Sequence, residues 1–168
     1  MLLWHITRDE FLLRDFLIHA LFPAYEAGIY QLRLEDLDDY LRSVPQRGGK
    51  TEHEWTRATR ERVAAGLLKT AVEFGMLRGK SSKEFAPYHL PEQSFVYLLH
   101  AMRAVLGNPR KVIDAPDWRM YLMRPSDVER ELLRLHQFRK LDYEVAGSLV
   151  LLKLPCASPI EYAEKIAA

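Results

Sequence analysis

The chain has 168 residues, of which 48% are hydrophobic, and its formal net charge is +1. This length and apolar content allow one compact domain, or two small subdomains that share a core, without disulfide support. Cys156 is the only cysteine, and neither a secretory leader nor an apolar run of 18 residues is found. The sequence therefore predicts a cytoplasmic protein that does not span a membrane.

Charge is distributed unevenly along the chain. Residues 1–44 carry four basic and eight acidic side chains, whereas residues 45–85 carry nine basic and five acidic ones. The middle of the chain is therefore positive despite the small overall charge, and such a local field attracts polyanions.

Residues 1–44 predict an N-terminal helical unit. Thr7 and Glu10 have the spacing of a capping box, and the apolar pattern that follows predicts a helix ending before Pro23. A second, acidic helix is expected from Glu35 to Arg42, before Pro45 and two glycines end it.

Residues 45–107 predict a unit with a long amphipathic helix. Thr51 and Glu54 form a second capping box, and Val63, Ala64, Leu67, Leu68, Ala71 and Phe74 share one arc of the helix that follows. Two short strands around Gly79 predict a basic-tipped hairpin over 76–86, and another helix runs from Pro91 to Gly107.

Residues 108–168 predict a connection followed by a similar pattern. Ser126 and Glu129 form a third capping box before a helix, and the segment 142–154 alternates around Gly147 as a hairpin does. Helix followed by hairpin thus occurs twice. The predicted fold class is mainly α, a helical bundle with two winged-helix-like units that each add a short β-hairpin.

The long helix carries the strongest indication of function. Opposite its apolar arc, small residues separate cations, so this face can lie close to a phosphate backbone, and the hairpin lysines extend the same basic footprint. The predicted contacts to duplex DNA are Arg57, Arg60, Arg62, Lys69, Arg78, Lys80 and Lys83. Of these, Arg60 falls within the apolar arc, so it could cover the core instead. Ordinary solvated helix charges explain the pattern about as well.

A second basic group, Arg110, Lys111 and Arg119, lies in the connection together with Trp118 and Tyr121. Basic and aromatic side chains together can stack on nucleic acid, so these three cations join the candidate DNA contacts. The two aromatic residues are expected in the core, with arginine stems covering them.

No pattern predicts catalysis. The six histidines lack zinc-ligand spacing, and no nucleotide-binding loop is present. The acidic residues Glu35, Asp36, Asp38 and Asp39 could hold magnesium for a nuclease, but consecutive carboxylates on a short helix diverge. We expect no enzyme activity, metal or cofactor. The acidic helix is expected to be solvated or to dock a basic partner.

Several passages resemble the BrxA family of BREX bacteriophage-exclusion systems. They are Trp4 to Phe16 (WHITRDEFLLRDF), Thr56 to Leu77 (TRATRERVAAGLLKTAVEFGML), Asp117 to Leu122 and Asp127 to Val145. The resemblance implies a helical protein with winged-helix elements that binds DNA and acts with the methyltransferase and ATPase components of the defence system, without enzyme activity.

BrxA-like proteins carry more residues before the Trp4 region, so the N-terminal unit is expected to be incomplete. The apolar residues Leu2, Leu3, Ile6 and Leu13 would then be partly uncovered, which favours a homo-oligomer or a partner. The competing hypothesis is a protein-protein adaptor that assembles other BREX components through the acidic helix and this apolar start, without touching DNA.

Overall fold

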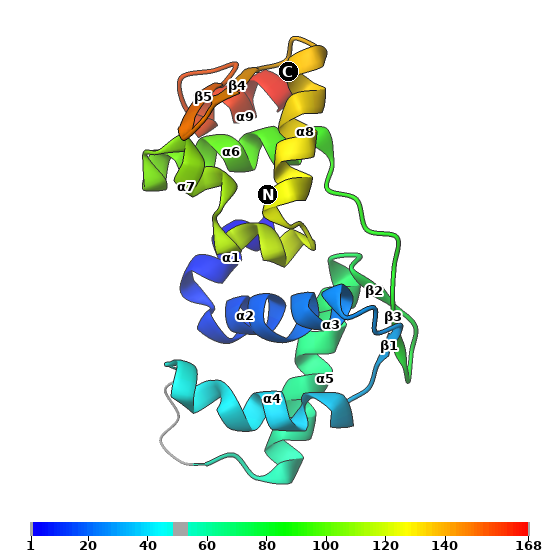
Figure 1. Ribbon diagram of the computed structural model, residues 1–168. Helices are drawn as coiled ribbons and strands as arrows, with labels where there is room; N and C mark the ends of the chain where they lie inside the picture. Colours follow the sequence, from blue (N-terminus) through cyan, green and yellow to red (C-terminus); the bar gives the residue numbers. More distant parts are fainter. Residues whose placement is uncertain (1, 49–53, 168) are drawn as a thin grey trace. The chain divides into compact units, whose positions relative to one another are not determined.

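A computed structural model describes residues 2–48 and 54–167. These residues form two compact units, 2–89 and the part from Leu90 onward. Both are mainly helical with small antiparallel sheets (Figure 1), which confirms the predicted fold class at this coarser level. In the described ranges, no helix has the length and apolar character needed to cross a membrane.

The unit 2–89 consists of helices and one short three-stranded sheet. Its core includes apolar side chains from several helical elements, among them Phe16, Leu21, Leu41 and Leu68, which are at most 2% exposed. The helical elements are α1 (Leu2–Asp9), α2 (Phe11–Phe16), the π-helix η1 (Leu17–Leu21), α3 (Phe22–Glu26), the 3₁₀-helix η2 (Glu35–Leu37), α4 (Asp38–Ser43), the 3₁₀-helix η3 (Val44–Arg47) and α5 (Arg57–Glu73).

The start of this unit differs from the predicted single helix. Thr7 does not cap a helix, because it lies inside α1 and its hydroxyl donates to the carbonyl of Trp4 at 3.0 Å. Helical backbone also continues beyond Pro23 into α3. The π-helical turn just before Pro23 accounts for this, because a wider turn accommodates a residue that lacks an amide donor and crowds the preceding turn. Leu3 is buried, whereas Leu2 is exposed.

The predicted hairpin over 76–86 is confirmed. Strands β2 (Leu77–Arg78) and β3 (Lys83–Phe85) pair antiparallel, and β1 (Gln31–Leu32) pairs with the other edge of β3, giving the order β1-β3-β2 (Figure 1). Gly79 opens the turn with φ of +105°, and a Cβ there would collide with the carbonyl oxygen of Ser82. Glycine is therefore required at this position.

In the second unit, helices pack around Trp118. Its indole nitrogen donates to the Val112 carbonyl at 2.6 Å, and its ring lies 5.0 Å from that of Phe95. Trp118 and Tyr121 are buried, so their expected place in the core is confirmed. The helices are α6 (Glu92–Leu106), α7 (Pro109–Ile113), the 3₁₀-helix η4 (Pro116–Tyr121), α8 (Pro125–Gln137) and α9 (Pro159–Ala167).

The predicted second hairpin is also confirmed. Strands β4 (Asp142–Ala146) and β5 (Leu149–Lys153) pair in the register Ala146↔Leu149 around the turn at Gly147, whose φ is +60°. Helix α8 begins without the predicted Ser126 cap. The amide of Arg124, the N-cap residue before α8, instead donates to the carboxylate of Asp127 at 2.9 Å.

A buried carboxylate joins α2 to α4 and to η3 in the first unit. Asp15 is 5% exposed and accepts hydrogen bonds from the Tyr40 hydroxyl at 2.9 Å and from Nε and Nη2 of Arg47 at 3.1 and 2.9 Å. The bond to Asp15 raises the pKa of Arg47, while burial and Asp15 raise that of Tyr40. One carboxylate thus satisfies two polar side chains from separate elements.

We predict that Asp15→Asn lowers the free energy of unfolding by about 2–3 kcal/mol, because it leaves the partly buried Arg47 cation without a counter-charge. Urea unfolding followed by circular dichroism measures the change. Asp39→Asn, at an exposed position of α4, is the control and should change stability by less than about 0.5 kcal/mol. Equal effects of the two substitutions would contradict the role of Asp15.

Candidate nucleic-acid interface

Helix α5 carries four of the ten predicted DNA contacts, Arg57, Arg60, Arg62 and Lys69. Its N-cap is Thr56, whose hydroxyl accepts from the Thr59 amide at 3.2 Å. The predicted capping box at Thr51 and Glu54 includes a residue outside the described ranges. Ala64, Leu67, Leu68 and Ala71 are buried as the apolar arc predicts, so the opposite face of the helix is left to solvent.

That opposite face combines cations with small residues. Arg62, Ala65, Gly66 and Lys69 are all exposed, and a Cβ added to Gly66 would meet no atom within 4 Å. Lys69 lies 3.6 Å from Glu73 in an exposed pair that contributes little to stability. Within the described part of the chain, no ion pair to Arg62 is found. These two cations are therefore available to an approaching anion.

Arg60 has a different place from the other predicted contacts. Its residue is 6% exposed, its Nε donates to Oδ1 of Asp38 at 2.5 Å, and its Nη1 donates to the Trp55 carbonyl at 2.6 Å. The guanidinium is thus directed toward α4 and is occupied there. We leave Arg60 out of the proposed contact set, because a phosphate cannot reach a side chain that is buried and paired in this way.

The hairpin cations also fall into two groups. Arg78 and Lys80 are exposed, and Arg78 lies 3.5 Å from Glu84 on the neighbouring strand. Lys83, in contrast, donates from its ammonium group to the carbonyl of Gly79 at 2.8 Å and to that of Lys80. In this conformation Lys83 closes the turn of the hairpin, and Lys80 is the cation left at its tip.

The remaining candidates lie in the second unit. Arg110 on α7 pairs with Glu129 on α8 at 3.0 Å, and Lys111 and Arg119 are exposed. Arg57, at the start of α5, is 85% exposed at its side chain and pairs with Glu61 at 2.9 Å. An exposed pair of this kind separates at little cost when a stronger counter-ion approaches.

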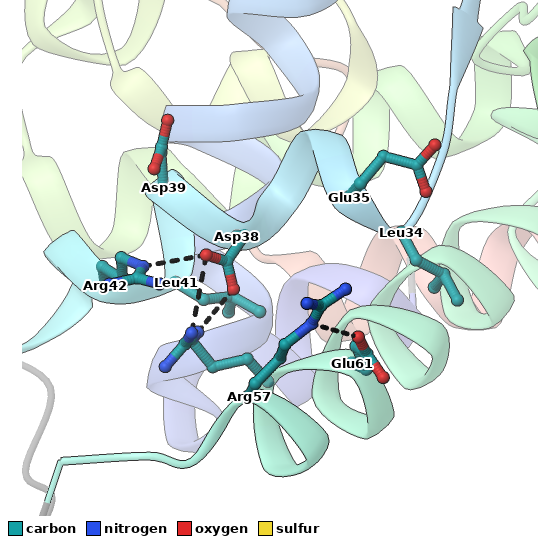
Figure 2. A pocket seen from close by; sticks show the side chains of 9 residues that line it. Leu34, Glu35, Asp38, Asp39, Leu41, Arg42, Arg57 and Glu61 are labelled. Atoms are coloured by element: carbon teal, nitrogen blue, oxygen red, sulfur yellow. Dashed lines mark hydrogen bonds and ion pairs between the residues drawn. The ribbon is translucent and has the colours of Figure 1, made fainter.

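An acidic groove of about 610 Å³ runs beside the first half of α5. Figure 2 shows Asp38 and Arg42, one turn apart on α4, bonded to each other at the groove, while the side chains of Asp39 and Glu35 point away from Asp38. Asp38 accepts from Arg42 at 2.8 Å as well as from Arg60, and these bonds lower its pKa. The lining residues are Leu34, Glu35, Asp38, Asp39, Leu41, Arg42, Arg57, Arg60 and Glu61.

The acidic residues of this region do not converge on one point. Asp36 accepts from the Arg33 amide at 2.7 Å, and Asp38 is bound by two arginines. Among the described residues, no group of three or more histidine, cysteine, aspartate or glutamate side chains is placed to hold a metal ion. Sequence reasoning missed the role of Asp38, although the i,i+4 spacing of Asp38 and Arg42 and the place of Arg60 in the apolar arc were visible signals.

We predict that Arg60→Ala lowers the free energy of unfolding by about 2–3 kcal/mol, because it removes a buried cation that joins α4 to α5. Arg57→Ala, which removes an exposed pair on the same helix, should cost less than about 1 kcal/mol. The comparison is made by urea unfolding, and similar losses in both variants would count against a positioning role for Arg60.

The Arg60–Asp38 pair should make the free energy of unfolding depend on pH. Because the pKa of Asp38 is lowered in the folded protein, the pair stabilises fully above about pH 4, and this contribution is lost as the pH falls through the lowered pKa. The difference in free energy of unfolding between the wild type and Arg60→Ala should therefore become smaller below about pH 4. Urea unfolding at a series of pH values measures it.

Comparison with known proteins gives one result. A model of the BrxA family matches residues 1–101. The search of curated proteins and that of solved structures gave no significant match. The family match includes all of α5 and the hairpin β2–β3, and it spans more than half of the sequence. The chain therefore belongs to the BrxA family, whose members are components of BREX bacteriophage-exclusion systems.

Proposed function

We propose that this BREX component binds double-stranded DNA without enzyme activity, and that it does so through the exposed face of α5 and the hairpin β2–β3. The observation that carries the proposal is the exposed face of α5, where Arg62 and Lys69 flank Gly66 and no side chain of the described residues covers the glycine. A phosphate backbone needs both features, positive charge and close approach.

The order of elements supports a winged helix in the unit 2–89. A winged helix combines a helix-turn-helix with a β-hairpin that forms the wing. Here α4 is followed by the 3₁₀-helix η3 and then by α5, and the hairpin β2–β3 comes next with β1 on its outer edge. In a helix-turn-helix the second helix enters the major groove. By this comparison α5 is the recognition helix, and Lys80 at the tip of the wing is placed for a flanking phosphate.

The second unit supports a related but simpler arrangement. Helix α8 is followed by the hairpin β4–β5, and the described residues add no third strand to that sheet. We assign the principal DNA contacts to Arg62, Lys69 and Lys80, with Arg57 and Arg78 at the margin. Arg110, Lys111 and Arg119 are assigned a secondary role in the other unit.

The adaptor hypothesis is favoured by one observation. Glu35 and Asp39 are exposed beside the groove and point away from the arginines that hold Asp38 (Figure 2). Such carboxylates can dock a basic surface of another BREX component. DNA binding and docking need not exclude each other, because the acidic residues and the Arg62–Lys69 face lie on different elements.

We predict that Arg62→Glu together with Lys69→Glu abolishes measurable DNA binding at moderate salt. Duplex titrations by fluorescence anisotropy at roughly 50 and 200 mM salt should show steep salt dependence for the wild type. Replacing only these two cations by alanine should lower the slope of log K against log salt by about 2, since each phosphate contact contributes about 0.9. Absence of binding by the wild type at low salt would favour the adaptor hypothesis.

The matched control is Arg33→Glu with Lys165→Glu, which reverses two exposed charges elsewhere. If DNA binding depends on total charge alone, this control loses as much affinity as the α5 variant. If it depends on the α5 face, the control binds with nearly wild-type affinity. Both variants are checked for folding by circular dichroism.

Gly66 offers an independent prediction. Gly66→Ala should raise the free energy of unfolding by up to about 1 kcal/mol, because a mid-helix glycine is unfavourable and the added methyl group meets nothing. Gly66→Leu should fold equally well but weaken DNA binding at least about tenfold, a cost of roughly 1.4 kcal/mol, because the side chain holds the backbone of the duplex away. Unchanged DNA affinity of Gly66→Leu would show that the duplex does not approach this face.

A further inference from the structure

A groove in the second unit has an unusual set of polar groups. It encloses about 430 Å³ between α6 and the segment that joins β5 to α9. Three of its lining residues carry nitrogen donors, namely His100, Arg103 and Lys153, and none of the lining residues is acidic. The other lining residues are Ala104, Leu152, Leu154, Cys156, Ala157, Ser158 and Pro159.

Two nitrogen atoms at this groove are buried without a partner. His100 is 3% exposed, and its Nε2 has no hydrogen-bond acceptor or donor in the described part of the chain. The same is true of Nη1 of Arg103, one helical turn further along α6. Leaving such groups unpaired costs free energy, and a ligand in the groove would recover it if a side-chain rotation brought these nitrogens to its surface.

The surroundings fix the orientation of these groups. The His100 ring stacks on Tyr162 of α9, with ring centroids 5.2 Å apart. Burial lowers the pKa of His100, and Glu161 opposes this to a smaller degree. The Glu161 carboxylate is itself engaged, because it accepts from the Ala157 amide at 2.8 Å. The Ser158 hydroxyl oxygen accepts from the Glu161 amide at 3.1 Å and keeps its own proton for donation.

We propose that this groove binds a phosphate group through Arg103, His100 and Lys153. An arginine fork offers paired donors to phosphate oxygens, and a lysine adds charge from a flexible stem. Lys153 is free to turn inward, because its ammonium lies 4.0 Å from Asp142 in a highly exposed pair. The apolar walls formed by Leu152, Leu154 and Pro159 leave room for the group that carries the phosphate.

The phosphate could come from a small molecule or from the backbone of bound DNA. This site is separate from the DNA face proposed on α5, and it does not depend on that proposal. All of its residues lie in the unit that starts at Leu90. A small phosphate compound and the DNA backbone present the same phosphate oxygens to the groove, so the two sources must be distinguished by experiment.

Cys156 supplies a built-in probe of the groove, because it lines the groove and is the only cysteine of the chain. The rate of alkylation by neutral iodoacetamide is followed by mass spectrometry on the full protein. Inorganic phosphate is compared with sodium chloride of equal ionic strength. We expect phosphate to slow alkylation saturably and several-fold, and to raise the thermal unfolding midpoint over the same concentration range.

The variant Arg103→Gln should raise the phosphate concentration that gives half-maximal protection of Cys156 at least about tenfold. Arg103→Lys should raise that concentration less. The control is Arg130→Gln, which changes an exposed arginine of α8 and should leave the effect intact. Protection that does not saturate, or that persists in folded Arg103→Gln, would overturn the proposal. If Arg103→Gln does not fold, the graded response of Arg103→Lys decides the question, and a wild-type response in that variant would overturn it.

The source of the phosphate is tested in the Arg62→Glu, Lys69→Glu variant. Protection of Cys156 by a short DNA duplex in this variant, lost again on adding Arg103→Gln, supports the site with the DNA backbone as its ligand. Protection by inorganic phosphate but not by the duplex supports the site with a small phosphate compound as its ligand. No protection by either probe would overturn the site, whether or not the wild type binds DNA.

Discussion

The ion pair between Arg60 and Asp38 is the contact on which the arrangement of the proposed DNA face depends. It joins α5 to α4 through a guanidinium that is almost fully removed from solvent. Because the pair is bound on one side of α5, the apolar arc and Arg60 together fix the rotation of that helix about its axis. Arg62, two residues on, is then directed to the other side and stays exposed. A buried cation with a carbonyl and a carboxylate partner is stable only in this geometry, so it specifies one packing of the two helices.

The same interaction explains how opposite charges can lie so close together. The carboxylate of Asp38 is neutralised by Arg60 and Arg42, which reduces the repulsion that an acidic α4 would exert on a polyanion beside α5. Glu61 is similarly occupied by Arg57. On α5, Arg62 is then the charged residue without an ion-pair partner among the described residues, and Lys69 has only an exposed pair with Glu73. Local pairing, rather than composition, determines the field that a ligand meets.

Much of the fold follows from patterns of neighbouring residues. The apolar arc of α5, the turn at Gly79 and the alternation around Gly147 are local signals, and each led to an element that the structure confirms. The predicted helix boundaries that are wrong lie where two local signals in the sequence compete. Thr7 has capping-box spacing but lies inside α1, since the preceding apolar residues also form helix. Pro23 is a signal for the end of a helix, but here the helical backbone continues past it after a π-helical turn. The partner of Arg60 could not be predicted, because Asp38 is 22 residues away in the sequence. The partner of Lys83 could not be predicted either, because nothing in the sequence shows whether a lysine ammonium bonds to a hairpin carbonyl or to solvent.

The two units differ in how their cations are engaged, and this difference bears on which of them would contact DNA first if the proposed function holds. On α8, Arg130 pairs with Asp127, and Arg134 pairs with both Glu92 and Glu131. Arg110 is held by Glu129. A phosphate that binds there must displace a carboxylate from each arginine, whereas Arg62 and Lys80 have no ion-pair partner among the described residues. The free energy gained from a phosphate contact is larger where no internal pair is lost. Under the proposed function, phosphate contacts at α5 and the hairpin β2–β3 would therefore form first, and a contact at Arg110 would form only after them.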